Sequence, residues 1–287
     1  MPAKAPQYTL ALSCPDRPGI VYRVAGTLAE LGCNITESAQ FNDPEAGRFF
    51  MRVCFVSLRS GVRRKEIEAA FAPAAAELSM DRIIVEAAAR PRVVILVSKP
   101  THCLVDLLYR VSIGELAIDP VAVVSNHRDA YQLVAAHNVP FHHLPVGAET
   151  KARQEERLLA LVAEEKADFV VLARYMQILS AEACAALRGR AINIHHSFLP
   201  SFAGAAPYSQ AFARGVKLIG ATAHYVTAEL DDGPIIEQDV ARVDHAMDAA
   251  ALAAMGRDIE KTVLARAVRW HAERRILVNG RKTVVFR

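Results

Sequence analysis

The 287-residue sequence lacks the patterns that mark disulfide-rich and membrane-spanning proteins. Its five cysteines form no C-x-x-C pair, so we expect free thiols in a reducing compartment, the cytoplasm, rather than a disulfide framework. No apolar run approaches the roughly 18 residues that a transmembrane helix needs. The first residues contain no apolar segment of the kind found in secretory signal peptides. We therefore expect no membrane partner.

Charge and glycine patterns exclude further classes. The formal net charge is +3, and lysines and arginines are scattered instead of forming the basic stripe of a nucleic-acid-binding protein. The loop over 98–102 carries neither G-x-G-x-x-G nor G-x-x-x-x-G-K-[ST], so the sequence suggests neither a dinucleotide nor a nucleoside triphosphate. Hydrophobic residues make up 52% and charged residues 23%, as in globular proteins with buried cores. The length predicts about two domains.

The first 86 residues carry the pattern of a ferredoxin-like βαββαβ domain. Apolar residues alternate in strand-like segments and recur at helical spacing between them, as at Val24 and Leu28. Pro18 is placed to open the first helix, and Gly32 to end it. We expect strands over 8–12, 33–41, 49–58 and 80–86 and helices over 20–31 and 63–78. Residues 87–91 follow as a short linker.

Residues 92–287 form a second predicted domain, in which strands and helices alternate. Val93–Val97 is a continuous apolar run, typical of a strand buried on both faces. The alternation predicts an α/β fold with a Rossmann-like, mostly parallel sheet, which binds ligands at the carboxyl ends of its strands. Asn279-Gly280 predicts a terminal hairpin. We expect strands over 93–97, 120–124, 169–172 and 220–226, a short strand within 139–144, and helices over 104–111, 129–137, 152–166 and 209–214.

The densest polar cluster is Asn193-Ile194-His195-His196-Ser197, which closes an apolar segment. If the strand continues through His195, alternation places the Asn193 and His195 side chains on one face and Ile194 in the core. An amide donor beside an imidazole at a strand end suits a site that stabilises an oxyanion and moves a proton. Taken alone, the pattern also fits a strand-end asparagine and a half-buried histidine.

The surrounding segments resemble the 10-formyltetrahydrofolate-dependent formyltransferase superfamily. The shared motifs are Asn193-x-His195, then Leu199-Pro200 and Gly204, then His224-x-Val226, then Leu230-Asp-x-Gly-Pro-Ile-Ile236. The resemblance implies that Asn193, His195 and Asp231 form a catalytic trio beside a folate pocket. The substrate-binding residues that we expect are Tyr175, Met176, Gln177, Ile178, Leu179, Val226, Thr227 and Leu230.

Two features resemble the deformylase branch of this superfamily. One is the variant 195–200, His-His-Ser-Phe-Leu-Pro, and the other is the segment 16–21, Asp-Arg-Pro-Gly-Ile-Val, which with the βαββαβ order resembles an ACT domain. The loop 98–103 also lacks the Gly/Asn/Ser-rich anion-binding sequence of transferases to glycinamide ribonucleotide. The resemblance implies hydrolysis of 10-formyltetrahydrofolate to formate and tetrahydrofolate, supplying formate for purine synthesis and balancing one-carbon pools. The alternatives are a formyltransferase to an amine and a catalytically silent folate sensor.

The resemblance also carries expectations about partners. We expect a small-molecule folate substrate and no cofactor. We also expect no metal site, because the histidines and Asp231 lack the short paired-ligand spacing of zinc enzymes. His224, in a predicted strand, is interpreted as a packed histidine. ACT domains imply a homo-oligomer and an amino-acid effector, and the residues expected to bind it are Asp16, Gly19, Asn34 and Ile35.

Overall fold

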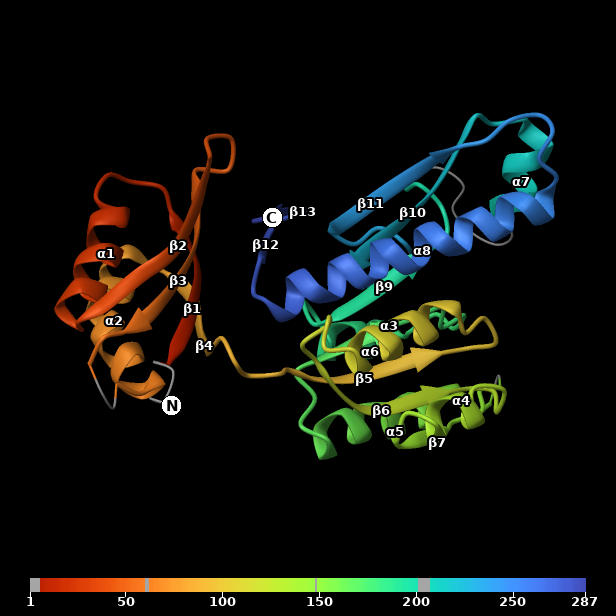
Figure 1. Cartoon of the computed structure of the whole chain (residues 1–287), viewed down its shortest axis with the longest axis horizontal. Coiled ribbons are helices and arrows are strands. Elements are labelled where there is room, and N and C mark those ends of the chain that lie inside the picture. Colours follow the sequence, from red (N-terminus) through yellow and green to blue (C-terminus); the bar gives the residue numbers. More distant parts are fainter. Residues whose placement is uncertain (1–5, 60–61, 148, 201–206) are drawn as a thin grey trace. The chain divides into compact units, whose positions relative to one another are not determined.

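The computed structural model describes residues 6–59, 62–147, 149–200 and 207–287, and the chain divides into two compact units (Figure 1). Unit 1 comprises Met1–Ala89, Glu273–Asn279 and Thr283–Arg287, and unit 2 comprises Arg90–Ala272 and Gly280–Lys282. The predicted boundary at 86–92 falls close to the change of unit at Ala89. Gly204, part of a motif quoted above, lies outside the described residues.

Unit 1 confirms the predicted βαββαβ order. Its elements are β1 (Gln7–Pro15), α1 (Ile20–Glu30), β2 (Cys33–Asp43), β3 (Arg48–Ser57), α2 (Arg64–Leu78) and β4 (Asp81–Glu86). The four strands form an antiparallel sheet in the order β2-β3-β1-β4. Leu10 and Leu12 of β1 share one core with Leu28 of α1 and Phe71 of α2, so both helices cover the same face. Strand alternation supplies one apolar face, and the helical spacing supplies its cover.

The C-terminal hairpin, predicted from Asn279-Gly280, is formed by β12 (Ile276–Asn279) and β13 (Lys282–Val285). The predicted second domain, 92–287, includes this hairpin, but most of it groups with unit 1. Polar contacts within unit 1 account for the difference. Arg52 Nε donates to the Glu273 carbonyl at 3.2 Å, and Asn279 Nδ2 donates to Asp43 Oδ2 at 2.6 Å. A turn motif predicts a hairpin, but not the surface on which it packs.

Unit 2 contains a seven-stranded sheet in the order β11-β10-β9-β8-β5-β6-β7. Pairing is parallel from β9 to β7 and antiparallel at β9-β10 and β10-β11, which confirms the mostly parallel sheet. Its strands are β5 (Arg92–Val97), β6 (Asp119–Ser125), β7 (Phe141–His143), β8 (Phe169–Leu172), β9 (Ala191–His195), β10 (Leu218–Tyr225) and β11 (Ile235–Arg242). Its helices are α3 (His102–Ser112), α4 (Tyr131–Ala135), α5 (Lys151–Glu164), α6 (Ala181–Ala186), α7 (Pro207–Arg214) and α8 (Ala249–Ala272).

The central strands are buried on both faces, as the apolar run in β5 predicts. Val94 and Leu96 share a core with Leu158 of α5. On the strand beside β5, Phe169 packs against His271 of α8, with ring centroids 4.7 Å apart. Three elements, α6, β11 and α8, have no predicted counterpart, and α4 is shorter than the predicted helix over 129–137.

Helix α8 carries a glycine in its interior, where glycine costs about 1 kcal/mol relative to alanine. A Cβ at Gly256 would lie 2.1 Å from Cζ and Oη of Tyr208 in α7. The Tyr208 ring occupies this notch, and its hydroxyl donates to Oε1 of Glu260, one turn along α8, at 2.6 Å. The close approach of a ring, rather than helix propensity, therefore explains the glycine.

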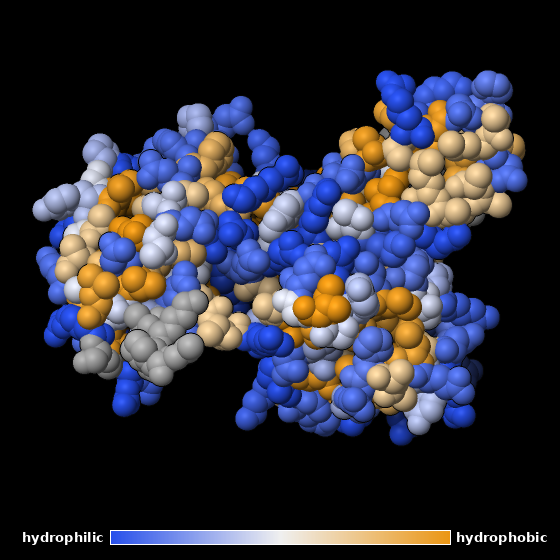
Figure 2. Space-filling model, in the orientation of Figure 1, coloured by the Kyte–Doolittle hydropathy of each residue, from blue (hydrophilic) through white to orange (hydrophobic). Residues whose placement is uncertain are grey.

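The surface of both units mixes apolar and polar side chains. No helix in the described ranges is long and apolar enough to cross a membrane. On the face that Figure 2 shows, hydrophobic residues are interspersed with hydrophilic ones on both units. Exposed apolar side chains such as Tyr22 and Leu58 are spread along the chain, so the homo-oligomer stays a prediction.

The close packing of Tyr208 against Gly256 predicts that the effect of Gly256→Ala on stability changes sign when the tyrosine ring is removed. Gly256→Ala should destabilise the protein by about 1–3 kcal/mol, because it forces the Tyr208 ring out of its place. In a Tyr208→Ala background the same change should stabilise it by up to about 1 kcal/mol, the helix propensity of alanine. Chemical denaturation of the four proteins measures both values. Equal effects in the two backgrounds would show that the ring does not decide the residue at 256.

Candidate active site

A pocket lies where β8 and β9 end, beside the loop between β10 and β11. Its cavity of about 260 Å³ is near the lower end of ligand-binding pockets. The structure brings together all eight residues expected to bind the substrate: Tyr175, Met176, Gln177, Ile178, Leu179, Val226, Thr227 and Leu230. Their segments, 175–179 and 226–230, are separated by β9 and β10 in the sequence and converge because those strands pair.

The three residues of the expected trio all line this pocket. His195 Nδ1 lies 3.2 Å from Asp231 Oδ2, and the two side chains are only 5% and 12% exposed. His195 Nε2 is buried and has no hydrogen-bond partner within the described part of the chain. A histidine whose Nδ1–H donates to a carboxylate keeps Nε2 available to accept a proton. Asn193 sits two residues earlier on β9, where its amide can act beside the imidazole.

Gly233 fixes the loop that carries Asp231. A Cβ at this position would lie 1.7 Å from the carbonyl oxygen of Tyr225, so glycine is required by close backbone contact. The Tyr225 N–H also donates to the Pro234 carbonyl at 2.9 Å. Asp231 itself has a φ of 56°, a left-handed conformation that aspartate tolerates better than most residues. The loop is thereby held against β10 with the carboxylate directed at His195.

His224 is predicted from the sequence as a packed histidine, but in the structure it also contacts Asn193. It is buried, and its Nε2 lies 3.1 Å from Asn193 Nδ2, while its Nδ1 lies 2.9 Å from the carbonyl oxygen of Tyr225. The carbonyl can only accept, so Nδ1 carries the proton and Nε2 accepts from the Asn193 amide. Burial is the main cause that lowers the pKa of His224, which keeps this tautomer neutral. His224 is therefore a positioning residue for Asn193.

Opposing influences act on the charges of the pocket. Burial raises the pKa of Asp231, but the hydrogen bond and charge of His195 outweigh it, so the net pKa is lowered and the carboxylate is ionised. Burial, reinforced by the nearby Arg174 charge, lowers the pKa of His196 to about 4. His196 is thus neutral near pH 7, and Asp231 is a fixed anion beside His195.

The four residues expected to bind an effector are not gathered within one chain. Asp16 follows the end of β1 and accepts from Asn42 Nδ2, and Gly19 immediately precedes α1. Asn34 and Ile35 begin β2, level with the first residues of β1. At about 3.3 Å per residue along a strand, the two pairs lie roughly 30 Å apart. Local motifs cannot show at which end of a sheet a segment lies, and the effector site stays a prediction.

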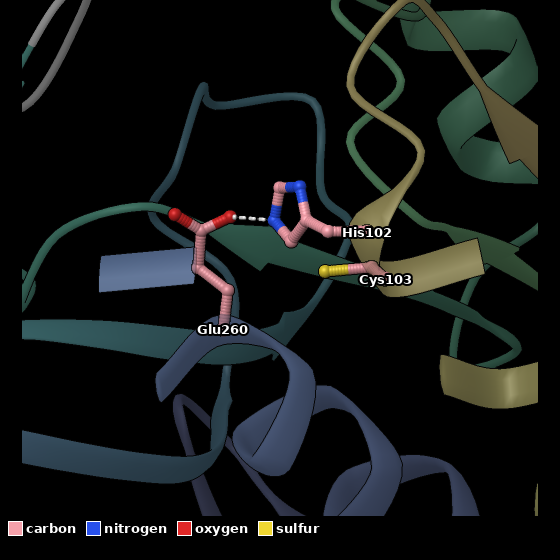
Figure 3. A group of neighbouring side chains, drawn as sticks. All are labelled: His102, Cys103 and Glu260. Atoms are coloured by element: carbon pink, nitrogen blue, oxygen red, sulfur yellow. Dashed lines mark hydrogen bonds and ion pairs between the residues drawn. The ribbon is translucent and has the colours of Figure 1, made fainter. Parts of the chain in front are cut away.

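His102, Cys103 and Glu260 offer one ligand atom each within 4.8 Å of one another, a spacing that could hold a metal ion (Figure 3). The carboxylate is already engaged, with His102 Nε2 at 2.7 Å from Oε2 and the Tyr208 hydroxyl at 2.6 Å from Oε1. Arg174 Nε adds a positive charge 3.4 Å from Oε2. Burial raises the pKa of the Cys103 thiol well above its usual value, which opposes a thiolate ligand. A hydrogen-bonded ion pair explains this cluster better than a cation site.

Comparison with known families agrees with both units. The Formyl transferase family model matches residues 91–268, and the ACT domain family model matches residues 8–70. A formyltetrahydrofolate deformylase of Bacillus subtilis is 50% identical over 280 residues, which are 96% of this chain and 93% of the relative. The chain belongs to the formyltetrahydrofolate deformylase family.

Solved structures distinguish the deformylase family from its transferase relatives. A crystal structure of formyltetrahydrofolate deformylase from Burkholderia mallei has a TM-score of 0.94 at 51% identity and covers 98% of this chain and 100% of its own. A glycinamide ribonucleotide transformylase from Symbiobacterium toebii has a TM-score of 0.66 at 29% identity and covers 69% of this chain and 95% of its own. The deformylase structure thus matches both domains, whereas the transformylase leaves nearly a third of the chain unmatched.

The contact of Gly233 with β10 predicts a loss of activity on a minimal substitution. Gly233→Ala should lower kcat/KM for formate release from a 10-formylfolate by about 100-fold or more, because a shift of about 1 Å in a catalytic group has that cost. Gly26→Ala is the matched control, since a Cβ there meets nothing within 4 Å. Full activity in Gly233→Ala would mean that Asp231 does not depend on this close contact.

The neutral, buried His196 predicts an acid-dependent loss of stability. Its pKa is about 4 in the folded chain, below the ordinary value of 6.5, so the unfolded chain takes up the proton first as the pH falls. Stability is therefore lost on going from about pH 6.5 to 4, by up to about 3 kcal/mol. Denaturant unfolding over this range should show a smaller fall for His196→Gln than for the native protein. Parallel curves would place His196 in a more solvated environment.

Proposed function

We propose that the protein hydrolyses 10-formyltetrahydrofolate to formate and tetrahydrofolate. The observation that carries this proposal is the 3.2 Å contact of His195 Nδ1 with Asp231 Oδ2, in a pocket whose wall includes every residue expected to bind folate. Relatives named formyltetrahydrofolate deformylase, at 39–50% identity over nearly the whole chain, support the same reaction. We expect no cofactor, because His195, Asn193 and Asp231 supply the proton transfer and oxyanion stabilisation that the hydrolysis requires.

The hydrolysis requires three groups. Water adds to the formyl carbon and loses a proton, the carbonyl oxygen becomes an oxyanion, and N10 gains a proton as the C–N10 bond breaks. His195 takes the proton at Nε2 and returns it to N10, a role worth about 10²–10⁴ in rate. Asn193 uses one amide N–H on His224, which leaves the second for the oxyanion, a donor worth about 10²–10³. Collapse of the intermediate gives a neutral amine at N10 and formic acid, which releases its remaining proton to solvent and leaves as formate.

Asp231 orients His195 and stabilises the imidazolium that forms when Nε2 accepts the proton. Its carboxylate is also 3.8 Å from His224 Nε2, so both histidines of the site face one anion. The charge is buried enough to act through a low dielectric and is not lost near neutral pH, since its pKa is lowered. The carboxylate also attracts the proton that the attacking water must lose.

Transfer to an amine is the alternative that the site supports less well. An amine acceptor would need free polar groups beside the formyl carbon, and the sequence offers the loop 98–102 for them. Ser98 Oγ instead donates to Asn126 Oδ1 at 2.7 Å and accepts from the Met176 N–H at 3.0 Å. His102 is engaged with Glu260. A silent sensor is supported less still, because all three residues of the trio line the pocket and His195 contacts Asp231.

The ACT domain and the biological setting complete the proposal. An amino-acid effector would bind unit 1 and regulate hydrolysis, and association of two or more chains could join residues from opposite ends of the sheet, such as Asp16 and Asn34. Formate from the reaction would serve purine synthesis and balance one-carbon pools. Five free cysteines, four of them buried, fit the reducing cytoplasm.

Formate release from 10-formyltetrahydrofolate by the purified protein, with no amine present, tests the reaction. The native chain should release formate and tetrahydrofolate in equal amounts. Asp231→Asn should be slower by about 100-fold or more, because the neutral amide cannot stabilise the imidazolium. Turnover that appears only when glycinamide ribonucleotide is added would make the protein a transferase. Silence under both conditions would favour the sensor.

A further inference from the structure

Arg174 is a cation in the wall of the pocket that the mechanism above does not use. Its side chain is 11% exposed, and it is the only lysine or arginine among the described residues that line the pocket. The other charged side chains of the lining, Asp231 and Glu229, are acidic. A buried guanidinium needs a partner, because an unpaired charge in a low dielectric is costly.

The backbone at Arg174 adds a second cost. Its φ is 65°, in the left-handed region where a glycine would be unstrained. Ser98, directly after β5, holds this conformation: the Arg174 carbonyl accepts from the Ser98 N–H at 3.2 Å, and the Met176 N–H donates to Ser98 Oγ at 3.0 Å. A long basic side chain at such a position, in place of glycine, points to a function for the guanidinium.

Glu260 holds this guanidinium but leaves part of it unused. The Glu260 side chain is 1% exposed, and its Oε2 lies 3.4 Å from Arg174 Nε. His102 and Tyr208 bind the same carboxylate and fix its position (Figure 3 shows His102). Arg174 Nη1 is buried and has no hydrogen-bond partner within residues 6–59, 62–147, 149–200 and 207–287. Arg174 lines the pocket, so its guanidinium keeps an unpaired donor beside the cavity.

The hydrolysis creates such an anion. Breaking the C–N10 bond leaves formic acid, which releases its proton at neutral pH and becomes formate, a carboxylate, in the same pocket as the Asp231 anion. The formate and Asp231 carboxylates repel each other because both are negative. An arginine guanidinium, with its fork of donors, is the group best matched to a carboxylate. We propose that Arg174 is the formate subsite, its guanidinium binding the carboxylate of the product as it leaves the formyl position. This assignment rests on the hydrolysis proposed above.

The Glu260 counter-charge sets the strength of this subsite. An arginine with no anion beside it would bind formate tightly and delay release. The neighbouring carboxylate offsets part of the positive charge, so formate binds weakly and departs. Arg174 thus opposes the repulsion by Asp231 without retaining the product.

Binding of [13C]formate to the tetrahydrofolate-saturated protein, measured by NMR titration, tests the assignment. We expect Arg174→Gln to weaken formate binding by about tenfold or more, because a charge-assisted hydrogen bond is lost. Arg174→Lys keeps the charge without the fork and should fall between the two. Arg266→Gln removes an exposed arginine that pairs with Asp239, and serves as the matched control with native affinity.

The possible outcomes distinguish a failure of the formate subsite from a failure of the proposed hydrolysis. If the native protein hydrolyses 10-formyltetrahydrofolate and Arg174→Gln, folded by circular dichroism, binds formate as tightly as the native protein, the subsite is overturned. If Arg174→Lys binds formate with native affinity and Arg174→Gln does not, the positive charge alone explains binding. That result would overturn the proposal that the guanidinium fork binds formate. Formate inhibition of turnover should weaken in parallel in Arg174→Gln. An absence of formate release from the native protein would instead overturn the proposed function.

Discussion

The contact of His195 with Asp231 is the constraint on which the rest of the catalytic unit depends. The two residues are separated in sequence by all of β10, and neither position alone distinguishes a catalytic group from an ordinary polar residue. They meet because β9 and β10 pair in an antiparallel register that sets Asn193 beside His224 and His195 beside Thr222. The chain must then turn back within a few residues to bring Asp231 to the imidazole. Only glycine at 233 permits that return, since its Cα passes against the Tyr225 carbonyl.

The electrostatics of the pocket follow from burial acting in opposite directions on acids and bases. Burial lowers the pKa values of His196 and His224, which therefore contribute shape and hydrogen bonds rather than charge. The burial of Asp231 raises its pKa, but the hydrogen bond and charge of His195 outweigh that effect and keep the pKa lowered. The permanent cation of the wall, Arg174, is balanced by Glu260, whose pKa is lowered by His102, Arg174 and Tyr208 against the effect of its burial. The site thus holds one anion at the imidazole and one partly neutralised cation beside it.

The fold can be predicted from the sequence where the apolar residues of a segment follow a single strand or helix periodicity. The alternation of β1 and β3, the spacing of α1 and the apolar run of β5 each reflect which faces are buried, so the βαββαβ unit and the mostly parallel sheet follow from them. Helix α8 has the spacing too, at Leu252, Ile259 and Val263, but it is rich in alanine and interrupted by Gly256 and Glu260. Tertiary contacts explain both residues. The Tyr208 ring packs against Gly256, and Glu260 belongs to a buried ion pair. The partners of His224 and Arg174 are invisible to the sequence for the same reason, since each depends on a residue more than 30 positions away or on a strand register.

The same buried ion pair bears on the choice of water over an amine. A transferase must leave room and free polar groups for a second substrate next to the formyl carbon. Here the polar groups at the end of β5 and the start of α3 are used within the protein: Ser98 ties the loop after β8 to β5, and His102 fixes Glu260, which in turn holds Arg174. An acceptor could bind these groups only by breaking contacts that position the pocket wall. Water needs none of them, because His195 and Asn193 supply what it requires. The contacts that hold the pocket wall in place are therefore the same contacts that leave no polar groups for an amine, so water is the favoured nucleophile.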